Sequence, residues 1–151
     1  MFDLTTYLPY LLNRAGFAAS AAFADALAEV GLTVPGWRVL AGLLHVERAR
    51  VGELAEQTSI EFSTLSRLID ALQRRGLVAR KPAKDDARVV HVTLTARGRA
   101  VARQLLPEAV ALEERMSAGM SAAEVRDLRR LLDKLYDNIR GEASAQRSAL
   151  A

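Results

Sequence analysis

The chain has 151 residues, a length that fits one domain and is sufficient to bury a hydrophobic core. Its residues are 50% hydrophobic and 26% charged, which is the ordinary composition of a globular protein. It contains no cysteine, so a disulfide, a thiolate metal site and a thiol redox switch are excluded.

The net charge is only +3, but the basic residues are unevenly distributed. Between Glu61 and Arg103 ten lysine and arginine residues face four acidic ones, so this segment carries +6 and the rest of the chain −3. Such a concentration of positive charge is what binding to a polyanion requires. A solvated charge run is the alternative, but it does not explain why the flanking segments are acidic.

Residues 5–30 are predicted to form a long, alanine-rich helix. Its broad apolar stripe, which needs a partner surface, consists of Leu8, Leu11, Leu12, Ala15, Ala19, Ala22, Phe23, Ala26 and Leu27. The N-terminus lacks a basic region, and charged residues interrupt the apolar stretch. Neither a signal peptide nor a membrane span is predicted, and we expect a cytoplasmic protein.

A second helix is predicted from Pro35, at a first helical position, to about Val46. Burial statistics alone make Trp37, the only tryptophan, a core residue. His45 is expected to interact with the dipole at the end of this helix. With no cysteine and with His91 far along the chain, a structural zinc site is not expected.

The stretch from Gly52 to Gly76 predicts two helices joined by a tight turn, with boundaries at about 52–58 and 62–75. On the second helix one face is apolar and carries Leu65, Leu68, Ile69 and Leu72, with Phe62 at its edge. The other face carries short hydroxyls and arginines: Ser63, Thr64, Ser66, Arg67, Asp70 and Arg74. A major groove accepts such a helix, although a polar face is more often only a solvated one.

A basic hairpin follows directly. Residues 77–81 and 89–94 are predicted strands, and residues 82–87 between them have the composition of a turn. The hairpin carries Arg80, Lys81, Lys84 and Arg88, an arrangement suited to straddling phosphates and placing one arginine in a minor groove.

The C-terminal third is predicted to be helical. Thr95 caps a helix over residues 96–119, with a kink at Leu106-Pro107. A capping box at Ser121 and Glu124 starts a last helix that reaches about residue 140, and residues 141–151 are expected to be a flexible tail. The first and last helices have apolar faces too wide for one such domain to cover, which predicts a two-fold dimer.

These motifs together resemble the MarR family of bacterial winged helix-turn-helix regulators. The resemblance rests on LTVPGWRVLAGL (32–43), LAEQTSIEFSTLSRLIDALQRRGLVAR (54–80), the Asp-x-Arg motif at Asp86 and Arg88, and VTLTARG (92–98). Thr58 departs from the family's frequent leucine, and Glu61 from its small capping serine or threonine. Either Ser59 or Ser63 is expected to cap the second helix in place of Glu61.

The resemblance implies a mainly α fold with a small β-hairpin wing, that is, an α+β winged helix-turn-helix core with N- and C-terminal dimerisation helices. In a single domain over residues 1–151, the DNA-binding lobe would span 35–94 and the dimerisation helices 5–30 and 96–140. The candidate residues for double-stranded DNA are Ser63, Thr64, Ser66, Arg67, Arg74, Lys84, Asp86 and Arg88.

The resemblance further implies a homodimeric regulator, a repressor, which binds an inverted-repeat operator and is released by a phenolic or carboxylic molecule. It places Trp37 beside the effector crevice, where an acid would meet Arg14 or Arg38. Neither a cofactor nor a metal is implied.

Two other functions fit the sequence less well. An enzyme is disfavoured because Gly-x-Ser-x-Gly, a phosphate-binding glycine loop and metal-ligand spacing are absent from the sequence. A winged helix used only for protein contacts or for nonspecific DNA binding, without an effector, would not need Ser63, Ser66 and Arg67 as base-reading residues.

Overall fold

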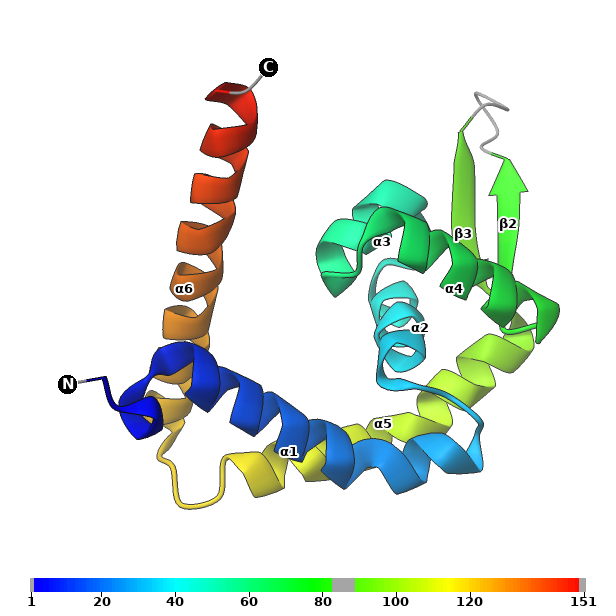
Figure 1. The fold of residues 1–151 in the computed structure, drawn as a ribbon. Helices are drawn as coiled ribbons and strands as arrows, with labels where there is room; N and C mark the ends of the chain where they lie inside the picture. Colours follow the sequence, from blue (N-terminus) through cyan, green and yellow to red (C-terminus); the bar gives the residue numbers. More distant parts are fainter. Residues whose placement is uncertain (1, 83–88, 150–151) are drawn as a thin grey trace. The chain divides into compact units, whose positions relative to one another are not determined.

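The computed structural model describes the backbone of residues 2–82 and 89–149, and the side chains of residues 2–82 and 89–141. The elements in chain order are η1 (Leu4–Thr6), α1 (Leu8–Glu29), α2 (Val34–Val46), β1 (Arg48–Arg50), α3 (Val51–Thr58), α4 (Phe62–Arg74), β2 (Val78–Pro82), β3 (Val90–Leu94), α5 (Ala96–Met116) and α6 (Ala122–Ala149) (Figure 1). The chain divides into two compact units, Met1–Leu112 and Glu113–Ala151. The predicted fold class, mainly α with a small antiparallel sheet, is confirmed.

The first long helix begins later than the sequence predicted. Asp3 accepts a hydrogen bond from the Thr5 amide at 2.8 Å and thereby starts the short 3-10 helix η1. Tyr7 is extended, with φ −74° and ψ 114°, so it separates η1 from α1. The expected single helix from Thr5 is therefore wrong at its start, because the Asp3 cap favours a separate turn.

α2 has the boundaries that its capping residues predict. The Thr33 hydroxyl accepts from the Gly36 amide at 3.3 Å, and Pro35 occupies the first turn, where its missing N–H costs no helical bond. The helix ends at Val46 as predicted. Glu47 then adopts φ +61° and turns the chain into the sheet.

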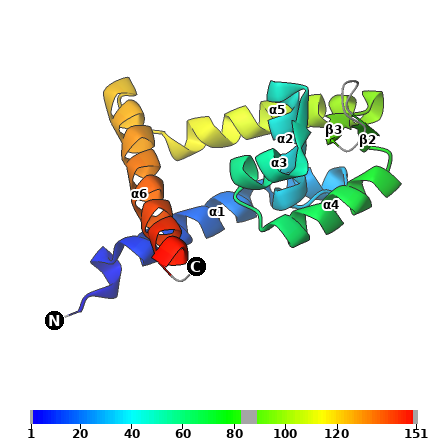
Figure 2. The same ribbon diagram turned by 90° about the horizontal axis from the view of Figure 1, so that it is seen from above.

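The wing hairpin belongs to a three-stranded antiparallel sheet with strand order β1-β3-β2. β2 and β3 pair from Val78 opposite Leu94 to Pro82 opposite Val90. β1, which pairs Ala49 with Val92 on the other side of β3, was not predicted from the sequence. Its pattern is too short to detect, because Ala49 is the one buried residue of three. Both views show β2 beside the C-terminal part of α4 (Figures 1 and 2).

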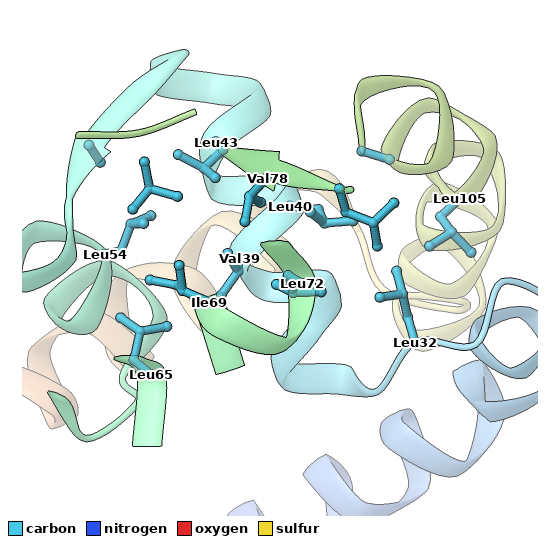
Figure 3. Close-up of a cluster of buried hydrophobic side chains, with 14 of the residues drawn as sticks. Leu32, Val39, Leu40, Leu43, Leu54, Leu65, Ile69, Leu72, Val78 and Leu105 are labelled. Atoms are coloured by element: carbon cyan, nitrogen blue, oxygen red, sulfur yellow. The ribbon is translucent and has the colours of Figure 1, made fainter. Parts of the chain in front are cut away.

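The core of the unit Met1–Leu112 is built mainly from aliphatic side chains of α1, α2, the helix-turn-helix, the sheet and α5, together with Phe23 of α1. Figure 3 labels Leu32, Val39, Leu40, Leu43, Leu54, Leu65, Ile69, Leu72, Val78 and Leu105 in this cluster. Leu54 of α3 and Leu65 of α4 are fully buried. The angle between α3 and α4 is therefore set by core packing, which leaves the opposite side of α4 to solvent.

α5 starts as predicted but continues past its proline. The Thr95 hydroxyl accepts from the Gly98 amide at 2.9 Å, which confirms the cap. The kink predicted at Leu106-Pro107 does not end the helix, which continues through Pro107 to Met116. Pro107 removes the helical donor of the Arg103 carbonyl, and both residues are exposed.

In the unit Glu113–Ala151, the capping box predicted for α6 is confirmed. The Ser121 amide donates to the Glu124 carboxylate at 2.7 Å, and the Glu124 amide donates to the Ser121 hydroxyl at 3.3 Å. α6 continues to Ala149, so the segment expected as a flexible tail from Gly141 is helical for most of its length. Its sequence is rich in alanine and contains no proline, and its helix propensity outweighs the single glycine.

Within the described part of the chain, no helix taken alone has the length and hydropathy of a membrane span. α1 and α2 meet the requirement only as a pair, bent by 79°.

Candidate nucleic-acid interface

The helix-turn-helix consists of α3, the turn from Ser59 to Glu61, and α4. Ser59 has φ +54°, a left-handed conformation that reverses the chain at the end of α3. The Ile60 amide donates back to the Ala55 carbonyl at 3.2 Å, and the Ile60 side chain packs against the core. The turn is therefore fixed both by a helix cap and by an apolar anchor.

Glu61 is the residue that caps α4. Its carboxylate accepts from the amides of Ser63 and Thr64, each at 2.9 Å, and from the Ser63 hydroxyl. These hydrogen bonds, that of the Ser63 side chain first, lower the pKa of Glu61 to about 2. The expectation that Ser59 or Ser63 would serve as the cap is therefore wrong. Sequence preferences missed Glu61 because shorter side chains dominate at this position.

The exposed side of α4 carries the side chains predicted to read bases. Ser63, Thr64, Arg67 and Arg74 are exposed, whereas Ser66 is half-buried. The Arg67 guanidinium lies 3.5 Å from the Ser63 hydroxyl, one helical turn away. The structure thus brings all five α4 candidates onto one helix, and four of them are accessible to a partner.

Arg80 on β2 ties the hairpin to α4. It forms an ion pair with Asp70, and its guanidinium lies 3.4 Å from both the Gln73 side-chain oxygen and the Ser66 carbonyl. The suggestion that Arg80 helps to straddle phosphates is therefore not supported, because its donors are directed to α4. This contact was not predicted, since nothing in the spacing of Asp70 and Arg80 shows that β2 lies beside α4.

The wing candidates Lys84, Asp86 and Arg88 lie outside the described residues. They connect β2 to β3, and the flanking Lys81 is exposed.

Two of the three effector candidates line one pocket of about 550 Å³. Trp37 and Arg38 border it, together with Ala41, Gly42, His45, Gln57, Thr58 and Ser59. The Trp37 ring also packs edge-to-face on Phe23 of α1, with centroids 5.7 Å apart. Arg14 does not line the pocket, and its guanidinium lies 5.9 Å from the centre of the Tyr10 ring on α1.

His45 was not among the predicted effector residues, although it borders the same pocket as Arg38. Its helical spacing from Arg38, seven residues or two turns, is the signal that places both on one side of α2.

Comparison with known proteins shows the family to which this chain belongs. The model described as MarR family matches residues 32–90. An HTH-type transcriptional repressor of Mycobacterium tuberculosis is 33% identical over 128 residues, which cover 85% of this chain and 92% of the relative.

Solved structures similar to this chain indicate the same family. A MarR-family transcriptional regulator from Silicibacter pomeroyi is 35% identical with a TM-score of 0.79, and the match covers 91% of this chain and 92% of that one. BpsR of Bordetella bronchiseptica, whose DNA binding is regulated by 6-hydroxynicotinic acid, is 28% identical with a TM-score of 0.81 and coverages of 91% and 98%. The chain therefore belongs to the MarR family: it is a DNA-binding transcriptional repressor with a winged helix-turn-helix fold, and not an enzyme.

Proposed function

We propose that this repressor acts as a homodimer on an inverted-repeat operator, with one α4 in each of two major grooves, and that a small aromatic or carboxylic acid releases it. The observation that carries the proposal is the exposed side of α4, where Ser63, Thr64 and Arg67 are accessible. Hydroxyls and a guanidinium can hydrogen-bond base edges, and short side chains allow the helix backbone to approach the groove.

The wing contributes electrostatic contacts in this proposal. Lys84 and Arg88 would lie against the backbone phosphates and the minor groove, with Asp86 beside them. The support is the concentration of positive charge between Glu61 and Arg103.

The homodimer is supported by apolar side chains that remain exposed in each unit taken by itself. In the unit Met1–Leu112, Phe2 and Phe17 are 73% and 75% exposed, and in the unit Glu113–Ala151, Leu131 and Ile139 are 51% and 63% exposed. Exposed apolar area of this kind marks a protein contact surface. The proposed partner is a second copy of the chain, because an inverted-repeat operator is bound by a two-fold dimer.

For the effector, the support is the pocket beside Trp37 and the precedent of BpsR. The Arg38 guanidinium and the His45 ring would meet a carboxylate, and the Trp37 ring would stack on an aromatic acid. A ligand bound here lies between α2 and the end of α3, so it would favour one position of the reading helices over another.

The DNA-binding proposal is tested by sequencing the genomic DNA fragments that the purified protein retains. We expect an inverted repeat whose half-sites lie about 10 base pairs apart, one helical turn, because that spacing places both copies of α4 on one face of the duplex. Retained fragments without a common sequence would favour a nonspecific DNA-binding module, and no retained DNA would favour a protein-interaction module.

The effector proposal is tested separately with 6-hydroxynicotinic acid and a panel of benzoic acids. Binding should change the Trp37 fluorescence and weaken DNA retention. Arg38→Gln should abolish both responses, whereas the control Arg14→Gln, outside the pocket, should retain them. A panel that leaves both signals unchanged contradicts the effector and not the DNA-binding proposal.

A further inference from the structure

Arg75, the residue that follows α4, extends its guanidinium to the end of α1. Its Nη1 donates to the Gly31 carbonyl at 2.6 Å and its Nη2 donates to the Val30 carbonyl at 2.7 Å. Both are short, charge-assisted hydrogen bonds made by one planar fork. They directly join the residue after α4 to the two residues that follow α1.

The end of α1 is an acceptor site that its own backbone does not satisfy. The amides of Gly31 and Leu32 turn back to carbonyls inside α1, at 2.9 and 2.8 Å, and close a left-handed cap. The later carbonyls of Val30 and Gly31 point onward, at the negative end of the helix dipole. Arg75 supplies both the missing donors and a compensating charge.

Gly31 leaves space for this contact. Its φ of +64° is a conformation that disfavours other residues, and a Cβ built there would lie 3.2 Å from Nη2 of Arg75. A side chain at position 31 would therefore press on the guanidinium as well as strain the backbone.

The same end of α4 is also attached to α5. The Gly76 carbonyl accepts from the Thr95 hydroxyl at 2.6 Å, and the Leu77 carbonyl accepts from the Thr95 amide at 3.1 Å. Gly98 packs so closely that a Cβ there would lie 1.8 Å from the Leu77 carbonyl oxygen. Residues 75–77 thus hold the end of α4 between the end of α1 and the start of α5.

We infer that Arg75 is a positioning residue for operator recognition: it fixes the orientation of α4 relative to α1 and does not contact DNA. The inference rests on the proposed base reading by α4 and on α1 belonging to the dimer contact. In such a dimer the distance between the two reading helices depends on how each α4 is held against its own α1. Base reading tolerates displacements of only about 0.5 Å, so a lost connection costs discrimination between sequences.

Arg74 provides a matched control. It precedes Arg75 directly, carries the same charge and is exposed, but it belongs to the side chains proposed to contact DNA. Arg74→Met and Arg75→Met remove the same charge from the same helix end and keep an aliphatic stem. Both variants lose the same net charge, so any difference between them depends on where the lost guanidinium lay.

The first experiment needs no DNA. The chain has no cysteine, so spin labels can be placed at Ala24→Cys on α1 and Glu56→Cys on α3, two exposed positions, and diluted with unlabelled chains. Arg75→Met should broaden the distance distribution between the labels, and Arg74→Met should match the parent. Arg75→Lys should broaden it less than Arg75→Met, because the ammonium keeps the charge and a donor although it lacks the fork. An unchanged distribution in folded Arg75→Met overturns the inference whether or not the protein binds DNA.

The second experiment compares affinity for the selected operator and for random duplex across a salt series. Arg74→Met should lower the salt slope by about one, as expected for a lost phosphate contact. Arg75→Met should leave the slope unchanged and reduce the operator-to-random affinity ratio about tenfold, equivalent to about 1.4 kcal/mol. A slope lowered by about one in Arg75→Met would make Arg75 a phosphate contact and overturn the inference.

Arg75→Lys keeps the charge and should restore part of the operator-to-random affinity ratio. A ratio in Arg75→Lys no better than in Arg75→Met would contradict the claimed hydrogen bonds. If no DNA is retained at all, the proposed function fails while the label distances still decide the structural claim.

Discussion

Glu61 defines the start of α4 through a carboxylate that accepts from two helix amides. The negative charge also faces the positive end of the helix dipole, so the ionised form is favoured twice. A residue that organises the first turn of α4 also fixes where Ser63 and Thr64 point, because the amides of both donate to it.

This cap predicts a specific pH dependence. The folded-state pKa of Glu61, about 2, lies below its ordinary value of 4.5, so its stabilisation is fully present above about pH 5 and is lost as the pH falls toward about 2. We expect wild type to lose stability relative to Glu61→Gln across that window, in urea unfolding at a series of pH values. Asp3 and Glu124, whose pKa values are also lowered, occur in both proteins and cancel in the difference. A difference that stays constant from neutral pH to about pH 2.5 would contradict the cap.

Gly98 gives a second residue-scale prediction. A methyl group there would meet the Leu77 carbonyl oxygen at 1.8 Å, and this neighbour is backbone that cannot rotate away. Gly98→Ala should destabilise the fold by about 2 to 3 kcal/mol or more. Gly52→Ala, with nothing near its added methyl, should be neutral or stabilise by up to about 1 kcal/mol. Equal unfolding midpoints for the two variants would show that Gly98 of α5 does not pack tightly against the Leu77 carbonyl.

At this scale the sequence predicted which residues α4 exposes, because helical periodicity separates its two faces. It did not predict the partners of Asp70 and Arg75. Those depend on which segments the tertiary fold brings beside α4, namely β2 and the end of α1.

Among the elements, β2 and α4 are joined by the partly exposed Asp70–Arg80 pair, with side chains 45% and 28% exposed. The pair joins β2 to α4, which is the helix proposed to read bases. Solvent screening limits its contribution to stability, which makes positioning its main effect.

A double-mutant cycle measures this connection. Asp70→Asn and Arg80→Met should each destabilise slightly, with a favourable coupling energy of about 0.2 to 1 kcal/mol in urea unfolding. A coupling near zero would show that the wing is held by core packing alone. A control cycle pairs Asp70→Asn with Arg97→Met, an exposed arginine on α5 to which Asp70 is not paired, and should show no coupling.

The helices α3 and α4 and the hairpin of β2 and β3 were predictable from the sequence, because each has its own periodicity and stop signals. β1 was not, because Arg48 and Arg50 flank a single buried alanine and the strand exists only through its pairing with β3. The length of α6 was underestimated because the small and polar composition of residues 141–151 was interpreted as a flexible tail.

For the whole molecule, the exposed apolar side chains of α6 support the proposed dimer. Leu128, Leu131, Leu132, Tyr136 and Ile139 are each at least 40% exposed. An isolated chain would keep this surface in water, so the proposed homodimer should resist dilution.

Deleting residues 121–151 tests the proposed dimer contact. The truncated chain should aggregate or unfold, because the deletion removes α6 and leaves the rest of the proposed dimer surface exposed to water. Deleting only residues 142–151 keeps these five side chains and should preserve the dimer in sedimentation. A soluble, folded, DNA-binding monomer from the longer deletion would refute the arrangement.

The central claim is that α4 reads bases while the wing holds phosphates, and the affinities of Arg67→Ala and Arg88→Ala for operator and random duplex across a salt series test it most directly. Asp70 is paired with Arg80, which leaves the Arg67 guanidinium near Ser63 on the exposed side. Arg67→Ala should cost about 1 to 3 kcal/mol per half-site on the operator and much less on random DNA. Arg88→Ala should weaken both and lower the salt slope by about one. Affinities that remain nearly unchanged on both duplexes would contradict the account.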